Sequence, residues 1–108
     1  MFFVEDNNIT ITKGDSGRVK LKFQNRDGSE YTPESGEEIV FSVKRKKESF
    51  SEVVLDKRGC EVVIDSGESE KLPSGEYWYD VCIKKGESER CTAIEGKFIV
   101  RKAVHNFE

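Results

Sequence analysis

The chain has 108 residues, enough for one domain with a modest core and too few for two. Charged residues make up 36 % of it and the net charge is -3, a balance that argues against a duplex-DNA-binding protein. Aromatic residues at 10 % and recurring valine and isoleucine argue against disorder. We therefore predict one domain over residues 1–108, with 1–7 and 103–108 as tails.

The opening residues and the cysteines bear on the compartment. No apolar run approaches the ~20 residues that a membrane-spanning helix needs. MFFV is too short for the core of a signal peptide, and EDNN follows it at once. The three cysteines include no CxxC pair, which favours free thiols in a reducing compartment over a disulfide framework or a zinc site. We expect synthesis in the cytoplasm and no contact with membrane or nucleic acid.

Apolar residues recur at every second position in seven short segments, the spacing of strands with one buried face. Turn-forming residues separate them, including KGDSG, the Asp27-Gly28 pair and a predicted hairpin turn that closes on Gly59. The polar stretch DSGESEK indicates a single helical turn capped by Asp65 or Ser66. The predicted strands are 9–13, 18–24, 38–45, 51–56, 60–65, 76–84 and 89–102.

About seven short strands at this spacing predict an all-β fold, an antiparallel immunoglobulin-like β-sandwich, with a closed barrel as the alternative. The connections leave no room for the helices of parallel βαβ units. The stretch KLPSGEYWYD fits a tyrosine corner, in which a tyrosine hydroxyl bonds the backbone a few residues upstream. Leu72 would plug the core, Gly75 would permit the bend, and Tyr77 would be the corner residue. Tyr79 stands where antibody domains have a cysteine, so we expect no inter-sheet disulfide.

The last two predicted strands form a hairpin, and a two-residue turn at Gly86-Glu87 defines its register. This register places Tyr79 opposite Ile94 and Tyr77 opposite Gly96. It gives the last strand a continuous inner face, made of Thr92, Ile94, Gly96, Phe98 and Val100.

The same register sets Cys82 directly across from Cys91 on the outward-facing side of the sheet. Two free thiols are one interpretation of this pair, and a cross-strand disulfide is the other. Cys60 is predicted to point inward as a small apolar residue.

The outer face around these cysteines is unusually apolar. A tryptophan grouped with small apolar neighbours indicates a contact with another chain. Cover by a loop, or by the N-terminal residues 1–4, is the alternative. The residues of this predicted interface are Trp78, Cys82, Cys91, Ala93 and Ile99, with Val40 beside them.

Motifs that carry catalysis or bind ions are missing from the sequence. There is no glycine-rich phosphate loop, no nucleophile elbow and no spaced calcium loop. The single histidine, His105, lies in the predicted tail, and Asp80 is a lone carboxylate that we expect to pair with a lysine or arginine. Trp78 alone is a thin platform for a sugar. We therefore expect no catalytic residues, no cofactor and no metal.

Two stretches of the chain resemble a known family. ITITKGDSGRVKLKFQNRDGSEYTPESGEEIVFSVKR resembles the opening of small immunoglobulin-like proteins of tailed phages and prophages of Gram-positive bacteria. LPSGEYWYDVCIKKGESERCTAIEGKFIV is similar to their Leu-Pro-x-Gly-x-Tyr and Tyr-Asp pattern, followed by a hairpin and a closing Glu-Gly-Lys-Phe strand. Among named domains, the sequence resembles the N-terminal domain of phage baseplate upper proteins.

The resemblance implies a non-catalytic virion structural protein that serves as a baseplate, fibre-anchoring or decoration module. Its partners would be other virion proteins and further copies of itself, and it would pass from the cytoplasm into the virion. The alternative is a bacterial immunoglobulin-like module that binds a surface glycan or protein through its loops and Trp78. An enzyme is the third hypothesis, and no feature of the sequence speaks for it.

Overall fold

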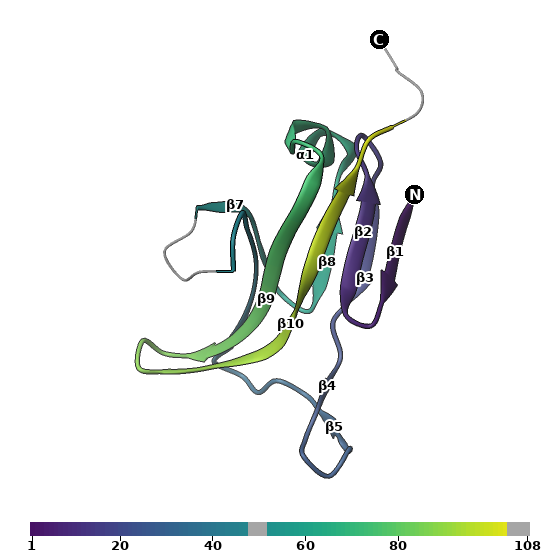
Figure 1. Cartoon of the computed structure of the whole chain (residues 1–108). Helices are drawn as coiled ribbons and strands as arrows, with labels where there is room; N and C mark the ends of the chain where they lie inside the picture. Colours follow the sequence, from purple (N-terminus) through teal and green to yellow (C-terminus); the bar gives the residue numbers. More distant parts are fainter. Residues whose placement is uncertain (48–51, 104–108) are drawn as a thin grey trace.

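The computed structural model describes residues 1–47 and 52–103, which are mostly β with one short helix (Figure 1). The strands are β1 (Phe2–Glu5), β2 (Asn8–Thr12), β3 (Gly17–Lys20), β4 (Phe23–Gln24), β5 (Glu30–Tyr31), β6 (Glu37–Lys44), β7 (Val53–Arg58), β8 (Glu61–Ile64), β9 (Gly75–Lys85) and β10 (Glu89–Arg101), and the helix is α1 (Ser66–Lys71). Six strands form one sheet in the order β1-β2-β10-β9-β6-β7, while β3-β8 and β4-β5 form separate ladders.

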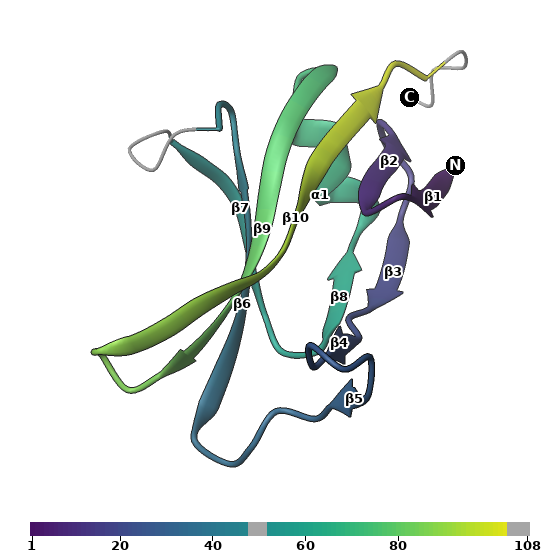
Figure 2. The same cartoon turned by 60° about the horizontal axis from the view of Figure 1, so that its bottom comes forward.

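The core lies between the six-stranded sheet and the β3–β8 ladder, which runs behind it (Figure 2). Burial alternates along β6 and β9, as the period-two pattern predicted. Phe41 and Phe98 are fully buried on the sheet side, and Val62 and Ile64 meet them from β8. Complete burial of each such side chain contributes about 1.5–3 kcal/mol, which holds the ladder against the sheet.

The structure confirms a mostly β fold, and the alternative of a closed barrel is wrong, because the large sheet ends at β1 and at β7. The predicted strand 18–24 is divided into β3 and β4, and β5 was not predicted. Residues 1–7, predicted as a tail, contain β1, which pairs with β2. Four apolar residues in a row, Met1 to Val4, gave no alternation there, so the strand pattern could not be recognised.

The large sheet is mixed, and the prediction of purely antiparallel strands is wrong. β2 runs parallel to β10, with Ile9 opposite Phe98 and Ile11 opposite Val100. No crossover helix is needed for this pair, because the other strands of the fold lie between β2 and β10 in the chain. Strands from the two ends of the sequence are thus hydrogen-bonded neighbours inside the sheet.

The hairpin predicted at Gly59 is instead a crossing between layers. β7 pairs with β6 in the large sheet, and β8 pairs with β3 in the smaller ladder. Gly59, at φ 99°, turns the chain from one to the other, and its N–H donates to the carbonyl of Ile39 at 3.0 Å. Cys60 sits in this bend ahead of β8 and is exposed, so the prediction that it points inward is wrong.

The register of the β9–β10 hairpin also differs from the prediction. The turn holds three residues, Gly86 to Ser88, so Lys85 faces Glu89 and every following pair is displaced by one. A second displacement of one residue occurs at a bulge between Thr92 and Ile94. Tyr79 therefore lies opposite Gly96, and Ile94 lies opposite Val81.

The two displacements have opposite effects on which side chains face inward. The longer turn reverses the face of each residue at the start of β10, and the bulge restores it. Phe98 and Val100 are buried in the core as predicted, and Gly96 and Ile94 share their face. Between the turn and the bulge the faces are exchanged, which moves Cys91 to the inner side.

A short connection links the smaller ladder back to the large sheet. Asp65 caps α1 with a capping box in which its side chain accepts from the Glu68 N–H, as the polar stretch predicted. Leu72 ends the helix and is buried in the core. Gly75 follows at φ 147°, and the Tyr77 hydroxyl donates to the Pro73 carbonyl at 2.5 Å. The Tyr77 side chain thereby links the bend after Leu72 to β9, the strand that follows it.

Gly96 lies at the closest approach between β10 and the turn that joins β1 to β2. A Cβ atom there would be 2.1 Å from the Asn7 carbonyl oxygen and 2.8 Å from Cε1 of Tyr79. The Tyr79 hydroxyl itself donates to that same carbonyl. Asn8 accepts a hydrogen bond from the Lys97 N–H at 2.9 Å, so side chains and backbone together hold this turn against β10.

We predict that Tyr77→Phe lowers the free energy of unfolding by about 1 kcal/mol, the typical value of one hydrogen bond. The ring stays buried, so the denaturant dependence of unfolding should not change. Urea unfolding followed by tryptophan fluorescence measures both quantities. An unchanged midpoint would show that the Pro73 contact does not stabilise the corner.

We also predict that Gly96→Ala destabilises the fold by about 2 kcal/mol or more, because the Asn7 backbone must move to admit a methyl group. Gly67→Ala is the matched control, since the nearest atom to its Cβ would lie at 3.4 Å and the position is helical. The control should be neutral or more stable by up to ~1 kcal/mol. Equal midpoints for the two variants in urea would contradict the close approach.

Candidate functional site

The outer face is the face of the six-stranded sheet that is turned away from the β3–β8 ladder. In Figure 1 it is turned to the viewer, and no described strand or helix crosses in front of it. Trp78, Cys82 and Ile99 lie on this face and are half-buried. Cys82 is flanked by Val40 on β6 and by Thr92 on β10. Three of the five predicted interface residues therefore share one surface.

The other two predicted interface residues are placed differently. Cys91 faces Ile83, on the opposite side of the sheet from Cys82, so the prediction that the two cysteines are neighbours is wrong. The unexpected third turn residue is the cause, because it moves each partner by one position. Ala93 is the extra residue of the bulge and is exposed. All three thiols are free.

Trp78 is surrounded by ammonium groups. Nζ of Lys47 lies 5.3 Å from the ring centroid and Nζ of Lys97 lies 5.5 Å from it, both within the range of cation–π attraction. Lys97 is itself anchored by Glu76 at 3.4 Å. These two ammonium groups lie over ring surface that a sugar would need for stacking.

The N-terminal residues do not cover Trp78. β1 forms the edge of the sheet, and both β2 and β10 lie between it and β9. On the outer face Phe3 pairs with Thr10, which pairs in turn with Ile99, and the Arg101 guanidinium lies 5.6 Å from the Phe3 ring. The N-terminal strand therefore widens the outer face beside Ile99 and leaves the area of Trp78 open.

Asp80 lies in the middle of the outer face, between Ser42 and Glu95 on the neighbouring strands. Burial raises the pKa of its carboxyl group. The positive charge of Lys44 acts against this rise in pKa, and the negative charge of Glu95 adds to it. The expected partner for Asp80 is thus a lysine on β6, at the range of an electrostatic interaction.

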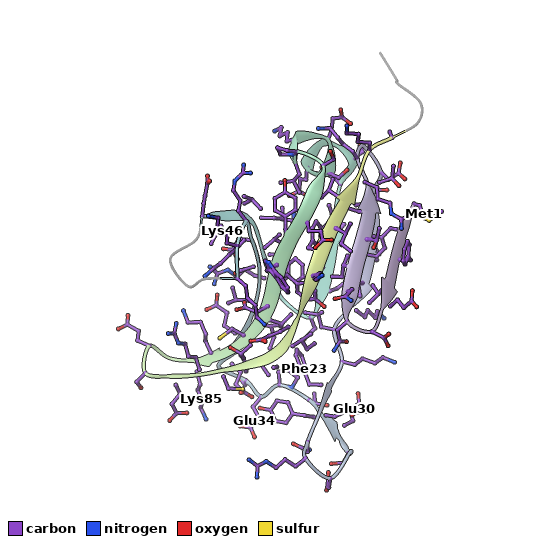
Figure 3. All side chains as sticks on the ribbon, in the orientation of Figure 1. Met1, Phe23, Glu30, Glu34, Lys46 and Lys85 are labelled. Atoms are coloured by element: carbon purple, nitrogen blue, oxygen red, sulfur yellow. The ribbon has the colours of Figure 1, made fainter. Side chains whose placement is uncertain are left out.

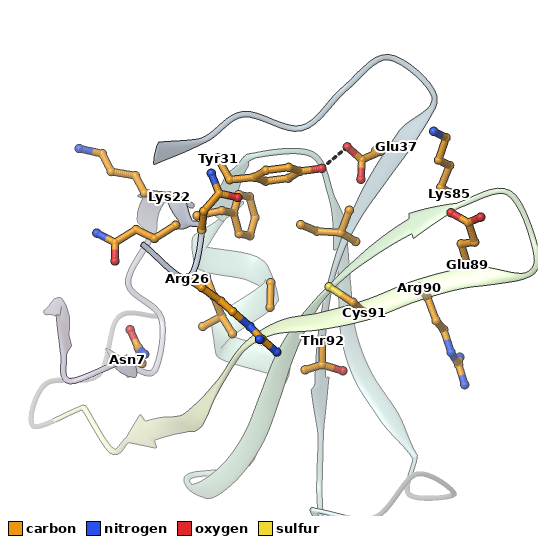
Figure 4. Close-up of a pocket in the computed structure, with 16 residues that line it drawn as sticks. Asn7, Lys22, Arg26, Tyr31, Glu37, Lys85, Glu89, Arg90, Cys91 and Thr92 are labelled. Carbon is orange, nitrogen blue, oxygen red and sulfur yellow. Dashed lines mark hydrogen bonds between the residues drawn. The ribbon is translucent and has the colours of Figure 1, made fainter. Parts of the chain in front are cut away.

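The opposite side of the β9–β10 hairpin carries a hollow of about 1060 Å³ (Figure 4). The hairpin extends past the β3–β8 ladder here, and the β4–β5 ladder forms the facing wall (Figure 2). Figure 3 shows Phe23 where β4 meets the body of the protein and Lys85 out on the hairpin. The residues that line this hollow are Asn7, Lys22 to Arg26, Tyr31, Glu37, Ile83, Lys85 and Glu89 to Ile94.

The hollow combines an apolar floor with a charged rim. Phe23 and Ile83 are buried, and Ile94 and Tyr31 pack beside them as partly buried side chains. Three lysine and arginine residues and two glutamates stand around this floor, whereas the Arg90 side chain points away from it on the face of Lys84. The charged residues of the rim are Lys22, Arg26, Lys85, Glu37 and Glu89.

Tyr31 and Glu37 form the one polar contact drawn across the rim in Figure 4. The Tyr31 hydroxyl donates to Oε1 of Glu37, which also accepts from the Glu34 N–H at 2.7 Å. The bond to Glu37 raises the pKa of Tyr31 to about 12, and the same bond lowers the pKa of Glu37. Both shifts favour the pair of neutral phenol and ionised carboxylate.

Among residues 1–47 and 52–103, no group of three histidine, cysteine, aspartate or glutamate residues is placed to hold a metal ion. His105, predicted as a solvated tail residue, lies outside the described residues, as do 104–108 of the predicted C-terminal tail. In the described part of the chain, no helix is both long enough and apolar enough to cross a membrane.

No protein-family model matches this chain, and a comparison with curated proteins found no significant match. The candidate surfaces therefore rest on the geometry of the chain itself.

Sequence reasoning identified the outer face but missed the hollow. The hollow forms because residues far apart in the chain, around Phe23, Ile83 and Cys91, face a common space. The Asp27-Gly28 pair correctly indicated a turn, which joins β4 to β5, yet nothing local shows which surface that hairpin faces. The length of the turn at Gly86 was the available signal, since it decides the face of Cys91.

We predict that Tyr31 remains protonated at pH 11, because its pKa is raised to about 12 from the ordinary 10.0. The stabilisation from this bond should persist below pH 10 and be lost as the pH rises through about 12. On the acidic side it should be lost as the pH falls through the lowered pKa of Glu37.

Glu37→Gln removes the carboxylate, so the pKa of Tyr31 should move back toward 10.0. Glu30→Gln is the control, since this exposed residue of β5 does not contribute to the shift. Tyrosine ¹³Cζ resonances, assigned with Tyr31→Phe, report the protonation state. Equal deprotonation at pH 11 in the wild type and Glu37→Gln would refute the pairing.

Proposed function

We propose that the chain is a non-catalytic structural module of a tailed-phage or prophage virion, with an immunoglobulin-like β-sandwich fold and a role in protein–protein assembly. The corner formed by Leu72, Gly75 and Tyr77 supports the fold, because its hydroxyl-to-backbone bond is typical of immunoglobulin-like sandwiches. The family resemblance of the two sequence stretches supports the setting. Baseplate, fibre-anchoring and decoration roles all use such a module as a docking unit.

One observation carries the assembly role: an apolar group on an uncovered sheet face. Trp78, Cys82 and Ile99 are half-buried by their own sheet, and Phe3 extends the group toward the edge. Tryptophan is among the residues that dominate binding energy at protein interfaces. A sheet face of this kind loses its remaining water contact when another protein packs against it.

A second copy of the chain is the occupant that the charges favour. Lys44 and Lys97 alternate with Asp80 and Glu95 over the three central strands of this face. Two copies related by a two-fold axis can bring unlike charges together around the apolar centre. Other virion proteins would then bind the oligomer. The alternative, a bacterial surface module that binds a glycan through Trp78, requires displacement of Lys47 and Lys97 from the ring.

We predict that Trp78→Ala weakens self-association at least tenfold, since truncation of a central interface tryptophan typically costs about 2 kcal/mol or more. Multi-angle light scattering over a concentration series gives the dissociation constant. Val63→Ala is the matched control, because Val63 is an exposed apolar residue on β8, outside this face. The control should associate like the wild type.

A wild type that remains monomeric at millimolar concentration would contradict this interface, as would an unaffected Trp78→Ala oligomer. Binding to a glycan array that depends on Trp78 in a monomeric protein would favour the alternative function instead. If Val63→Ala dissociates as readily as Trp78→Ala, the self-association contact lies on the β3–β8 ladder and not on the outer face.

A further inference from the structure

One stretch of β10 has an open edge although the strand lies inside a six-stranded sheet. β2 pairs with β10 only from Phe98 to Arg101, while β9 pairs with it from Glu89 onward. Lys97 is the next residue, and its N–H is taken by the Asn8 side chain. Among the described residues, no strand pairs with the other edge of Glu89 to Glu95. Unpaired backbone groups of this kind are a template for an additional strand.

This open edge faces the hollow. A strand that lines a cavity with its face contributes every second residue, as β9 does with Ile83 and Lys85. β10 instead contributes six consecutive residues, Glu89 to Ile94. Consecutive lining residues mean that the backbone edge borders the space. The wall opposite is the β4–β5 ladder, with Tyr31 toward the hollow (Figure 4).

The charges of the rim select the chemistry of the ligand. None of the three rim cations forms an ion pair within the described part of the chain. Elsewhere lysines and arginines are paired with carboxylates, among them Arg18, Arg45, Lys57, Arg58 and Lys97. Of the two rim glutamates, Glu37 is already engaged by Tyr31 and the Glu34 N–H. In a chain of net charge -3, this rim is a local region of unbalanced positive charge.

We propose that the open edge of β10 binds an extended acidic segment of a partner protein by strand addition. The segment's backbone pairs with the edge at Glu89 to Ile94, and its alternate side chains enter the hollow over Phe23 and Ile83. Its carboxylates meet the rim cations Lys22, Arg26 and Lys85. The segment therefore alternates acidic and apolar residues over about eight positions, the reach of a short strand.

A second copy of the chain does not fit this site. Two β10 edges in antiparallel register would bring the cationic rims of both copies together, and like charges on paired strands repel. The site lies on the opposite side of the sheet from Trp78, so it is independent of the proposed self-association. A partner segment here would link the module to a different protein.

The test is fluorescence anisotropy with a labelled synthetic peptide of alternating glutamate and leucine. A second peptide with lysine in place of glutamate is the charge control. We expect the acidic peptide to bind with micromolar affinity and the basic peptide to bind at least tenfold more weakly. Failure of the acidic peptide to bind below 1 mM, or equal binding of both peptides, would overturn the proposal.

Lys85→Glu should weaken binding of the acidic peptide at least tenfold, since it reverses a charge on the rim. Lys84→Glu is the matched control, because Lys84 is next to Lys85 but faces the outer side of the sheet with Trp78 and Cys82. This control should bind the peptide within about twofold of the wild type. Equal loss in the two variants would show a general charge effect and refute the site.

The backbone pairing has its own test. An acidic peptide that is N-methylated at alternate residues keeps its side chains but cannot donate from one edge, so it should lose binding. Hydrogen exchange should show added protection in Glu89 to Ile94 with the unmodified peptide. Unchanged exchange, or full binding by the methylated peptide, would overturn strand addition. Trp78→Ala should bind the peptide normally. A failure of the proposed self-association through Trp78 would therefore leave this proposal intact.

Discussion

The bulge at Ala93 is the constraint on which the arrangement of both candidate surfaces depends. A three-residue turn at Gly86 displaces the start of β10 by one position, and without correction Phe98 and Val100 would point away from the core. The extra residue at Ala93 returns them to it, where both are buried. The hydrophobic burial of these side chains, worth about 1.5–3 kcal/mol each, is the force that selects the bulged register.

The same bulge divides β10 into two parts with different roles. From Gly96 onward the strand lies within the sheet, paired on both sides and braced by the turn at Asn7. Before the bulge it pairs with β9 alone, and Cys91 faces the hollow. The turn at Asn7, with φ 63°, contacts β10 at Gly96, and the pairing of β2 with β10 begins two residues further on. The contact between the Asn7 turn and Gly96 thus stabilises the sheet, and the edge of β10 that precedes this contact stays open.

The two faces of the hairpin differ in chemistry as well as in shape. The outer face has Trp78 between two lysines, with carboxylates such as Asp80 nearby, so both signs of charge surround its apolar group. The hollow has an apolar floor and an excess of cations. With the proposed self-association on one face and the proposed site for an acidic segment on the other, the module could join copies of itself to another component. This combination suits an assembly role.

Local patterns in the sequence determined most of the strands, the capped helical turn α1 and the bend at Leu72 to Tyr77, because alternation, capping and turn chemistry act between residues near in the chain. The outer placement of Trp78 followed from alternation alone. Only the tertiary structure decided the parallel pairing of β2 with β10, the face of Cys91 and the hollow. These features depend on turn length, on a bulge and on contacts between distant segments. Local sequence gives alternative strand registers nearly equal free energies, and the packing of the core decides which register forms.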